Sequence, residues 1–140
     1  MDQLQNPKSE GTLIVQTTSG SLSVPVPGVT VIVRMARENG NSDILRVLVT
    51  NESGRTAPIR IETPSAAESL TPSGTKPYTE ISAEILAPGY YDTVITGIPV
   101  YPGITSLQPV RMIPRPEREN AAGTPEKTVV ISEGSSLPSL

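Results

Sequence analysis

The sequence is poor in the side chains that most often carry out catalysis. Its 140 residues include no His and no Cys, which excludes a His-based catalytic triad, a structural zinc site and a haem. Paired carboxylates could hydrolyse a glycoside, and Glu80 and Glu84 could share one outer strand face. They sit too far apart on one strand to act together, and a solvated face accounts for both. We therefore expect no catalytic residue, no metal and no cofactor.

Crosslinking and glycosylation are the other chemistries that the residue types allow. An internal isopeptide bond needs a lysine on an inner strand beside a buried carboxyl, and we expect Lys8, Lys76 and Lys127 outside the core strands. An intermolecular bond through Lys127 stays open. Residues 51–53 (NES) fit the N-glycosylation sequon, but Asn, Ser and Gly are also the residues that tight turns favour. We interpret Asn51 as a turn residue.

Three tyrosines are candidates for a ligand platform. Tyr90, Tyr91 and Tyr101 could together present a flat surface to a glycan or a peptide, because tyrosine suits half-exposed contacts. Alternatively, one or two of them fill the open end of a sandwich whose core is otherwise aliphatic. We favour the second interpretation.

The charge and hydropathy of the chain exclude two classes of partner. Eleven basic residues stand against 14 acidic ones, for a net charge of −3, without the positive clustering that nucleic acids require. No apolar run approaches the roughly 18 residues of a membrane span. The first residues have neither a basic start nor an apolar core, so no Sec signal is predicted. A nearly neutral domain permits association with its own copies.

Short alternating segments between Pro- and Gly-rich turns predict an all-β fold. The expected class is a seven-strand antiparallel sandwich in which the two sheets share one apolar core. Pro109 within the last strand indicates an edge or a bulge, because proline donates no ladder hydrogen bond. The expected strands cover residues 12–18, 28–34, 44–50, 58–62, 78–87, 90–96 and 104–112, and the core includes Val15, Val31, Val47, Ile61, Ile85 and Ile95.

The C-terminal tail carries one further strand. We divide the chain into an N-terminal arm (1–10), the sandwich (11–114), a polar linker (115–126) and a tail (127–140). Within the tail, Thr128, Val129, Val130 and Ile131 form a strand without a hairpin partner, and such a strand pairs with an open sheet edge. That edge can belong to a neighbouring copy or to the same sandwich, and the sequence leaves both open.

The order of these segments resembles the carboxypeptidase regulatory-like domain, a transthyretin-like seven-strand sandwich. Residues 11–15 (GTLIV), 26–31 (VPGVTV), 50–56 (TNESGRT) and 87–90 (APGY) carry the resemblance, which spans about residues 11–114 and none of the tail. A narrower likeness to the small β domain of clostridial spore cortex-lytic and peptidoglycan-binding proteins rests on residues 63–64 (TP), 69–72 (SLTP), 77–78 (PY) and 98–105 (IPVYPGIT). It implies a Gram-positive cell or spore surface, with cell-wall or spore-envelope components as partners.

Two functions are compatible with these features. The first is a structural protein that self-associates, as an oligomer or a filament, when its tail strand adds to a neighbour's sheet; head-to-tail pairing does not close on itself. The alternative is an accessory module that binds a glycan or a protein within a cell-wall or spore-cortex hydrolase system. Neither requires enzymatic activity of this chain.

Overall fold

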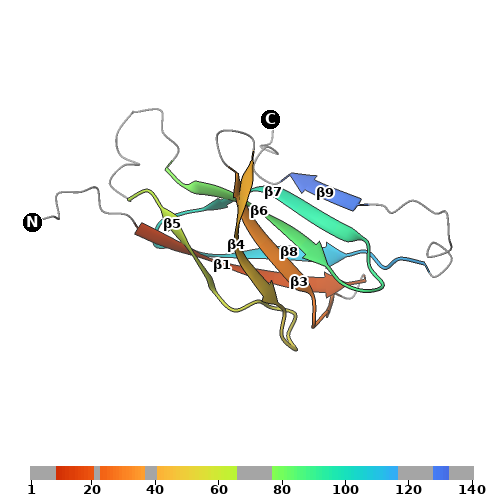
Figure 1. The fold of residues 1–140 in the computed structure, drawn as a ribbon. Coiled ribbons are helices and arrows are strands. Elements are labelled where there is room, and N and C mark those ends of the chain that lie inside the picture. Colours follow the sequence, from red (N-terminus) through yellow and green to blue (C-terminus); the bar gives the residue numbers. More distant parts are fainter. Residues whose placement is uncertain (1–8, 21–22, 37–40, 66–76, 117–127, 133–140) are drawn as a thin grey trace, which may run out of the picture.

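The computed structural model is an all-β sandwich of two sheets. It describes residues 9–20, 23–36, 41–65, 77–116 and 128–132. Figure 1 shows the two sheets face to face, with the tail strand beside β7. The strands of the described residues are β1 (Ser9–Ser19), β2 (Val24–Pro25), β3 (Thr30–Ala36), β4 (Ser42–Val49), β5 (Ile59–Thr63), β6 (Thr79–Leu86), β7 (Asp92–Val100), β8 (Thr105–Met112) and β9 (Thr128–Ser132).

The first sheet is built around β1. β8 pairs with β1 in parallel along one edge, while β5 and β2 pair antiparallel with successive parts of the other edge. In the described residues β8 pairs with no other strand, so Pro109 lies on an edge strand, as its missing N–H predicts.

The second sheet has the order β4-β3-β6-β7-β9. Its pairings are antiparallel except that of β7 with β9, which is parallel. The all-β sandwich is thus confirmed. The described residues add the short strand β2 to the seven expected strands and the expected tail strand. The pairing of β1 with β8 is parallel, unlike the antiparallel sandwich expected, and the tail strand β9 also pairs in parallel. Parallel pairing joins strands that are distant in sequence, so no local pattern could reveal it.

The core lies between the sheets and is aliphatic. Alternate residues of β1, β3, β5, β6 and β8 point into it, as a pleated strand requires. Five of the six predicted core residues are at most 2% exposed. The buried cluster comprises Leu13, Val15, Val26, Val29, Val31, Val33, Ile59, Ile61, Ile81, Ala83, Ile85, Ile95, Ile98, Val100, Val110 and Met112.

Val47 is the exception, and its prediction as a core residue is wrong. It is 59% exposed and lies opposite Ile32 of β3. A register shift makes Leu45 an extra residue in β4, between the pairs Arg34–Ile44 and Val33–Arg46. Beyond this bulge Leu48, opposite buried Val31, faces the core and Val47 faces solvent, because a one-residue slip exchanges the two faces.

A second bulge explains why β7 is longer than predicted. Ile81 pairs with Ile98 and Ala83 with Ile95, so two residues of β7, Thr96 and Gly97, lie against one residue of β6. Gly97 has a φ of 71°, a conformation that glycine adopts without strain. The inward residues have odd numbers before the bulge (Thr93 and Ile95) and even numbers after it (Ile98 and Val100). The alternation in the sequence therefore breaks at Thr96, which is where the predicted strand ends.

Candidate functional site

The tail strand lies on the open edge of β7 in its own chain. The predicted segment Thr128–Ile131 falls within β9, which runs parallel to β7 from the pair Asp92–Thr128 to the pair Thr96–Ser132. Of the two pairings that the sequence left open, the structure, which contains a single chain, shows the one within the same chain. Pairing with a second copy stays a prediction.

The two faces of β9 differ. Val129 and Ile131 are half-buried, and Ile131 packs against the core cluster. Val130 between them points outward and is 63% exposed. At the end of the ladder the Thr96 hydroxyl donates to the Ser132 hydroxyl at 3.1 Å. Inward apolar contacts and a backbone ladder therefore hold β9, while none of its residues belongs to the buried cluster.

The chain leaves the sandwich close to the place where β9 begins. After β8, Pro114 forms an antiparallel bridge with Tyr90, just before the start of β7. The Arg115 N–H donates to the Gly89 carbonyl at 2.8 Å. β9 begins at Thr128, opposite Asp92, which lies two residues after Tyr90 in the chain. Both ends of the intervening segment therefore lie beside the same end of β7.

The structure does not bring the three candidate tyrosines together. Tyr90 and Tyr91 precede β7, and Tyr101 follows it, so the nine residues of β7 place them about 30 Å apart at roughly 3.3 Å per residue. Tyr91 is 7% exposed, with the Arg115 guanidinium 5.7 Å from its ring centre. Tyr101 stacks at a tilt on Tyr78, with ring centres 5.1 Å apart. Tyr90 packs against the core, so filling one end of the sandwich is the better interpretation of Tyr90 and Tyr91.

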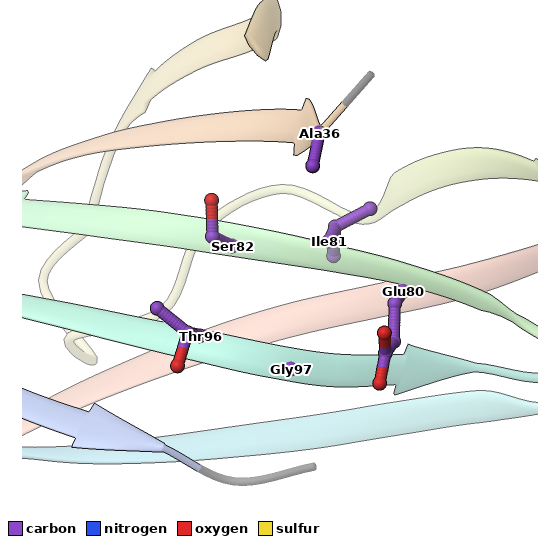
Figure 2. A pocket seen from close by; sticks show the side chains of 6 residues that line it. All are labelled: Ala36, Glu80, Ile81, Ser82, Thr96 and Gly97. Atoms are coloured by element: carbon purple, nitrogen blue, oxygen red, sulfur yellow. The ribbon is translucent and has the colours of Figure 1, made fainter. Parts of the chain in front are cut away.

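A shallow hollow marks the bulge of β7 on the outer face of the second sheet. It encloses about 200 Å³. Figure 2 shows Glu80 at one end, Ser82 and Thr96 at the other, and Gly97 between them. The end of β3, at Ala36, closes one side. The volume is below the roughly 300 Å³ at which small-molecule sites begin. No sequence signal marked this hollow, because it depends on the bulge.

The sequon residues form a tight turn, as the sequence predicts. The Asn51 side-chain oxygen accepts hydrogen bonds from the backbone N–H groups of Ser53 and Arg55, at 2.9 and 3.1 Å. Gly54 closes the turn with a φ of 75°. The Asn51 side chain therefore has a structural role in this turn.

The remaining candidate chemistry gains no support. Lys8, Lys76 and Lys127 lie outside the described residues, so the structure does not test the crosslinking prediction. Across the described ranges, no group of three or more acidic, His or Cys residues could hold a metal ion. Glu84 is in an ion pair with Arg34 of β3, at 3.2 Å. Among the same residues no helix is long and apolar enough to cross a membrane.

The comparisons with known proteins concern the fold. No protein-family model matches the chain, and no curated protein matches it. Among solved structures, catechol 1,2-dioxygenase from Pseudomonas arvilla C-1 superposes with a TM-score of 0.52 at 16% identity, over 90% of this chain and 60% of that one. The enzyme from Acinetobacter sp. ADP1 gives 0.49 at 14% identity, over 94% and 61%. GBS52, the minor pilin of Streptococcus agalactiae, gives 0.45 at 16% identity, over 85% and 49%.

The likeness to the Pseudomonas arvilla enzyme, at 16% identity, shows a shared fold alone. The chain spans about three fifths of the dioxygenase chains that it matches. The narrower assignment to the carboxypeptidase regulatory-like domain stays a prediction from the sequence motifs.

Proposed function

We propose that this chain is a non-enzymatic structural protein whose copies assemble by exchange of β9. In the assembled form, β9 of one copy leaves its own β7 and pairs with β7 of the next. The observation that carries the proposal is the position of β9 on an open sheet edge, at the end of a linker longer than that position requires. A cell or spore surface is the setting that the sequence resemblance implies.

The length of the linker supports exchange. Eleven residues separate Pro116 from Thr128. The twelve residue-to-residue steps between these two positions reach about 37 Å when extended, at roughly 3.1 Å per step. The pairs Tyr90–Pro114 and Asp92–Thr128 place Pro116 within about 23 Å of Thr128, from spacings of about 3.3 Å along a strand and 4.8 Å between strands. The surplus lets the same β9 reach an adjoining copy.

Concentration decides between the two forms. Exchange replaces each β7–β9 contact by an identical one, so the contacts themselves favour neither form. A segment joined to its own site by a short linker has an effective concentration there in the millimolar range. We therefore expect monomers in dilute solution and assembly where copies are crowded. Head-to-tail exchange gives an open filament where the rotation from one copy to the next does not close a ring.

Addition of the strand from outside tests the proposal directly. A chain ending at Pro116 keeps every residue of the buried cluster, all of which lie between Leu13 and Met112. A labelled peptide of residues 126–140 should bind this shortened chain, as measured by fluorescence anisotropy. The peptide carrying Ile131→Asp should not bind, because the charge faces the core. The matched Val130→Asp peptide should bind, because Val130 points outward.

Two results would overturn the proposal. One is failure of the unmodified peptide to bind the shortened, folded chain. The other is a full-length protein that sediments as a monomer up to about millimolar concentration yet loses thermal stability on truncation, which would show that β9 serves only its own sandwich.

The accessory binding module gains no observation in its favour from the described residues. Its tyrosine platform is divided between the two ends of β7, and the hollow at the bulge is small. We therefore place it second.

A further inference from the structure

The opposite edge of the same sheet is also open. We propose that β4 is a two-fold pairing site for β4 of a second copy, so that the second sheet continues from one molecule into the other. This contact is independent of β9, which lies at the far edge of the sheet, and it goes beyond the proposed strand exchange.

The backbone of β4 offers unpaired groups at two positions. The Thr50 N–H donates to the Val29 carbonyl at 2.9 Å, and the Thr50 carbonyl accepts from the Gly28 N–H at 3.0 Å. Successive residues of a strand direct their backbone N–H and C=O groups to opposite edges. The backbone groups of Leu48 therefore also point toward β3, while those of Val47 and Val49 point to the open edge. In the part of the chain that the structure describes, β4 pairs only with β3. Val47 and Val49 therefore each present one donor and one acceptor to a partner strand.

The side chains of this stretch lack the usual protection of an edge strand. Val47 and Val49 are each 59% exposed, and Ile44 on the same face is 55% exposed. No charged residue lies between Arg46 and Glu52. Natural sheets protect open edges with charges, prolines or bulges. The edge strand of the first sheet, β8, has Pro109 for this purpose. The bulge at Leu45 protects only the first half of β4.

One register fits a second copy best. With Leu48 opposite Leu48 of the second copy, each Val47 lies opposite a Val49, and these two pairs exchange four backbone hydrogen bonds. Outward valines then meet outward valines, and half-buried Leu48 meets its equivalent on the inner face. Centring the pairing on Val47 would place inward Leu45 opposite outward Val49, and centring it on Val49 would engage the Asn51 N–H, which already donates to Arg55.

The occupant we infer is a second copy because the stretch is complementary to itself. A two-fold contact needs the same surface on both molecules, and the Leu48-centred register places apolar residues against apolar residues without opposing two charges. The paired stretch, residues 46–50, is about 17 Å long at roughly 3.3 Å per residue. So short a ladder falls below the standard interface size, and the dimer should form at high micromolar concentrations.

Engineered cysteines test the register, because the native chain has none. Leu48→Cys would place two thiols at a non-hydrogen-bonded pair, with Cα atoms about 4.5 Å apart, within the range that a disulfide spans. Val49→Cys would place them two residues out of register, about 8 Å or more apart, where no disulfide forms. Under mild oxidation at several hundred micromolar, Leu48→Cys should give a covalent dimer and Val49→Cys should not, although Val49 is the more exposed side chain.

Two further variants keep the result decisive. The double variant Val47→Cys with Val49→Cys leaves Leu48 in place and should also crosslink, since these positions face each other. All variants are made in the full chain carrying Ile131→Asp, which removes strand exchange, so the two proposals fail separately. Crosslinking of Val49→Cys as fast as Leu48→Cys would overturn the proposal. So would the absence of covalent dimer in both the Leu48→Cys and the double variant when circular dichroism shows them folded.

Discussion

Replacement of Gly54 by alanine should destabilise the sandwich through two separable effects. The residue has a φ of 75°, and the left-handed conformation costs an L-residue about 1–2 kcal/mol. An added Cβ would also lie 2.5 Å from the Thr17 carbonyl oxygen. That oxygen accepts the Val26 N–H at 3.0 Å, so it cannot shift without weakening a bond inside the sandwich. Overpacking of this kind costs about 1–3 kcal/mol.

Gly89 provides the matched control. Its φ is 83°, and an added Cβ would meet nothing within 4 Å, so Gly89→Ala carries only the backbone cost. The sums are about 2–5 kcal/mol for Gly54→Ala and about 1–2 kcal/mol for Gly89→Ala. At about 4 °C per kcal/mol for a domain of this size, Tm should fall by about 8–20 °C and about 4–8 °C.

Thermal unfolding followed by circular dichroism measures both variants against the parent chain. The comparison isolates the contact with Thr17, because both glycines have positive φ values and only one is enclosed. Equal decreases in Tm for the two variants would show that the enclosed position of Gly54 contributes nothing, and would refute the reasoning.

Two further substitutions test the faces of the strands and the core. Val31→Asp should unfold the domain, because Val31 is fully buried and an unpaired buried charge costs several kcal/mol. Val47→Asp, at a 59% exposed position, should leave the free energy of unfolding in urea within about 0.5 kcal/mol of the parent. If both variants unfolded the domain, the bulge in β4 would be contradicted. Thr93→Val should raise stability by about 1 kcal/mol. The Thr93 hydroxyl is buried and has no hydrogen-bond partner among the residues that the structure describes, and an unsatisfied polar group carries a desolvation cost. A lower Tm for Thr93→Val would indicate that this hydroxyl is bonded after all.

The sequence alone determined what depends on neighbouring residues. Period-two alternation identified the inward positions of β1, β3, β5 and β6, among them Val15 and Ile85, because a pleated strand directs alternate side chains to one face. The Asn51–Gly54 turn followed from residue types with local conformational preferences. Pro109 marked an edge strand through its missing donor, and the apolar run of the tail marked β9.

Tertiary structure decided what depends on partners distant in the chain. Which strand β9 joins, and that β8 lies parallel to β1, are set by pairings between segments far apart in sequence. The bulges in β4 and β7 arise from register against β3 and β6, and a single extra residue reverses the faces of everything that follows. That reversal turned Val47 and Val49 outward, and the place of β4 at the end of the strand order left its edge open among the described residues. Alternation within a strand is a local property of the chain, whereas its phase relative to the core is fixed only when the neighbouring strand is in place.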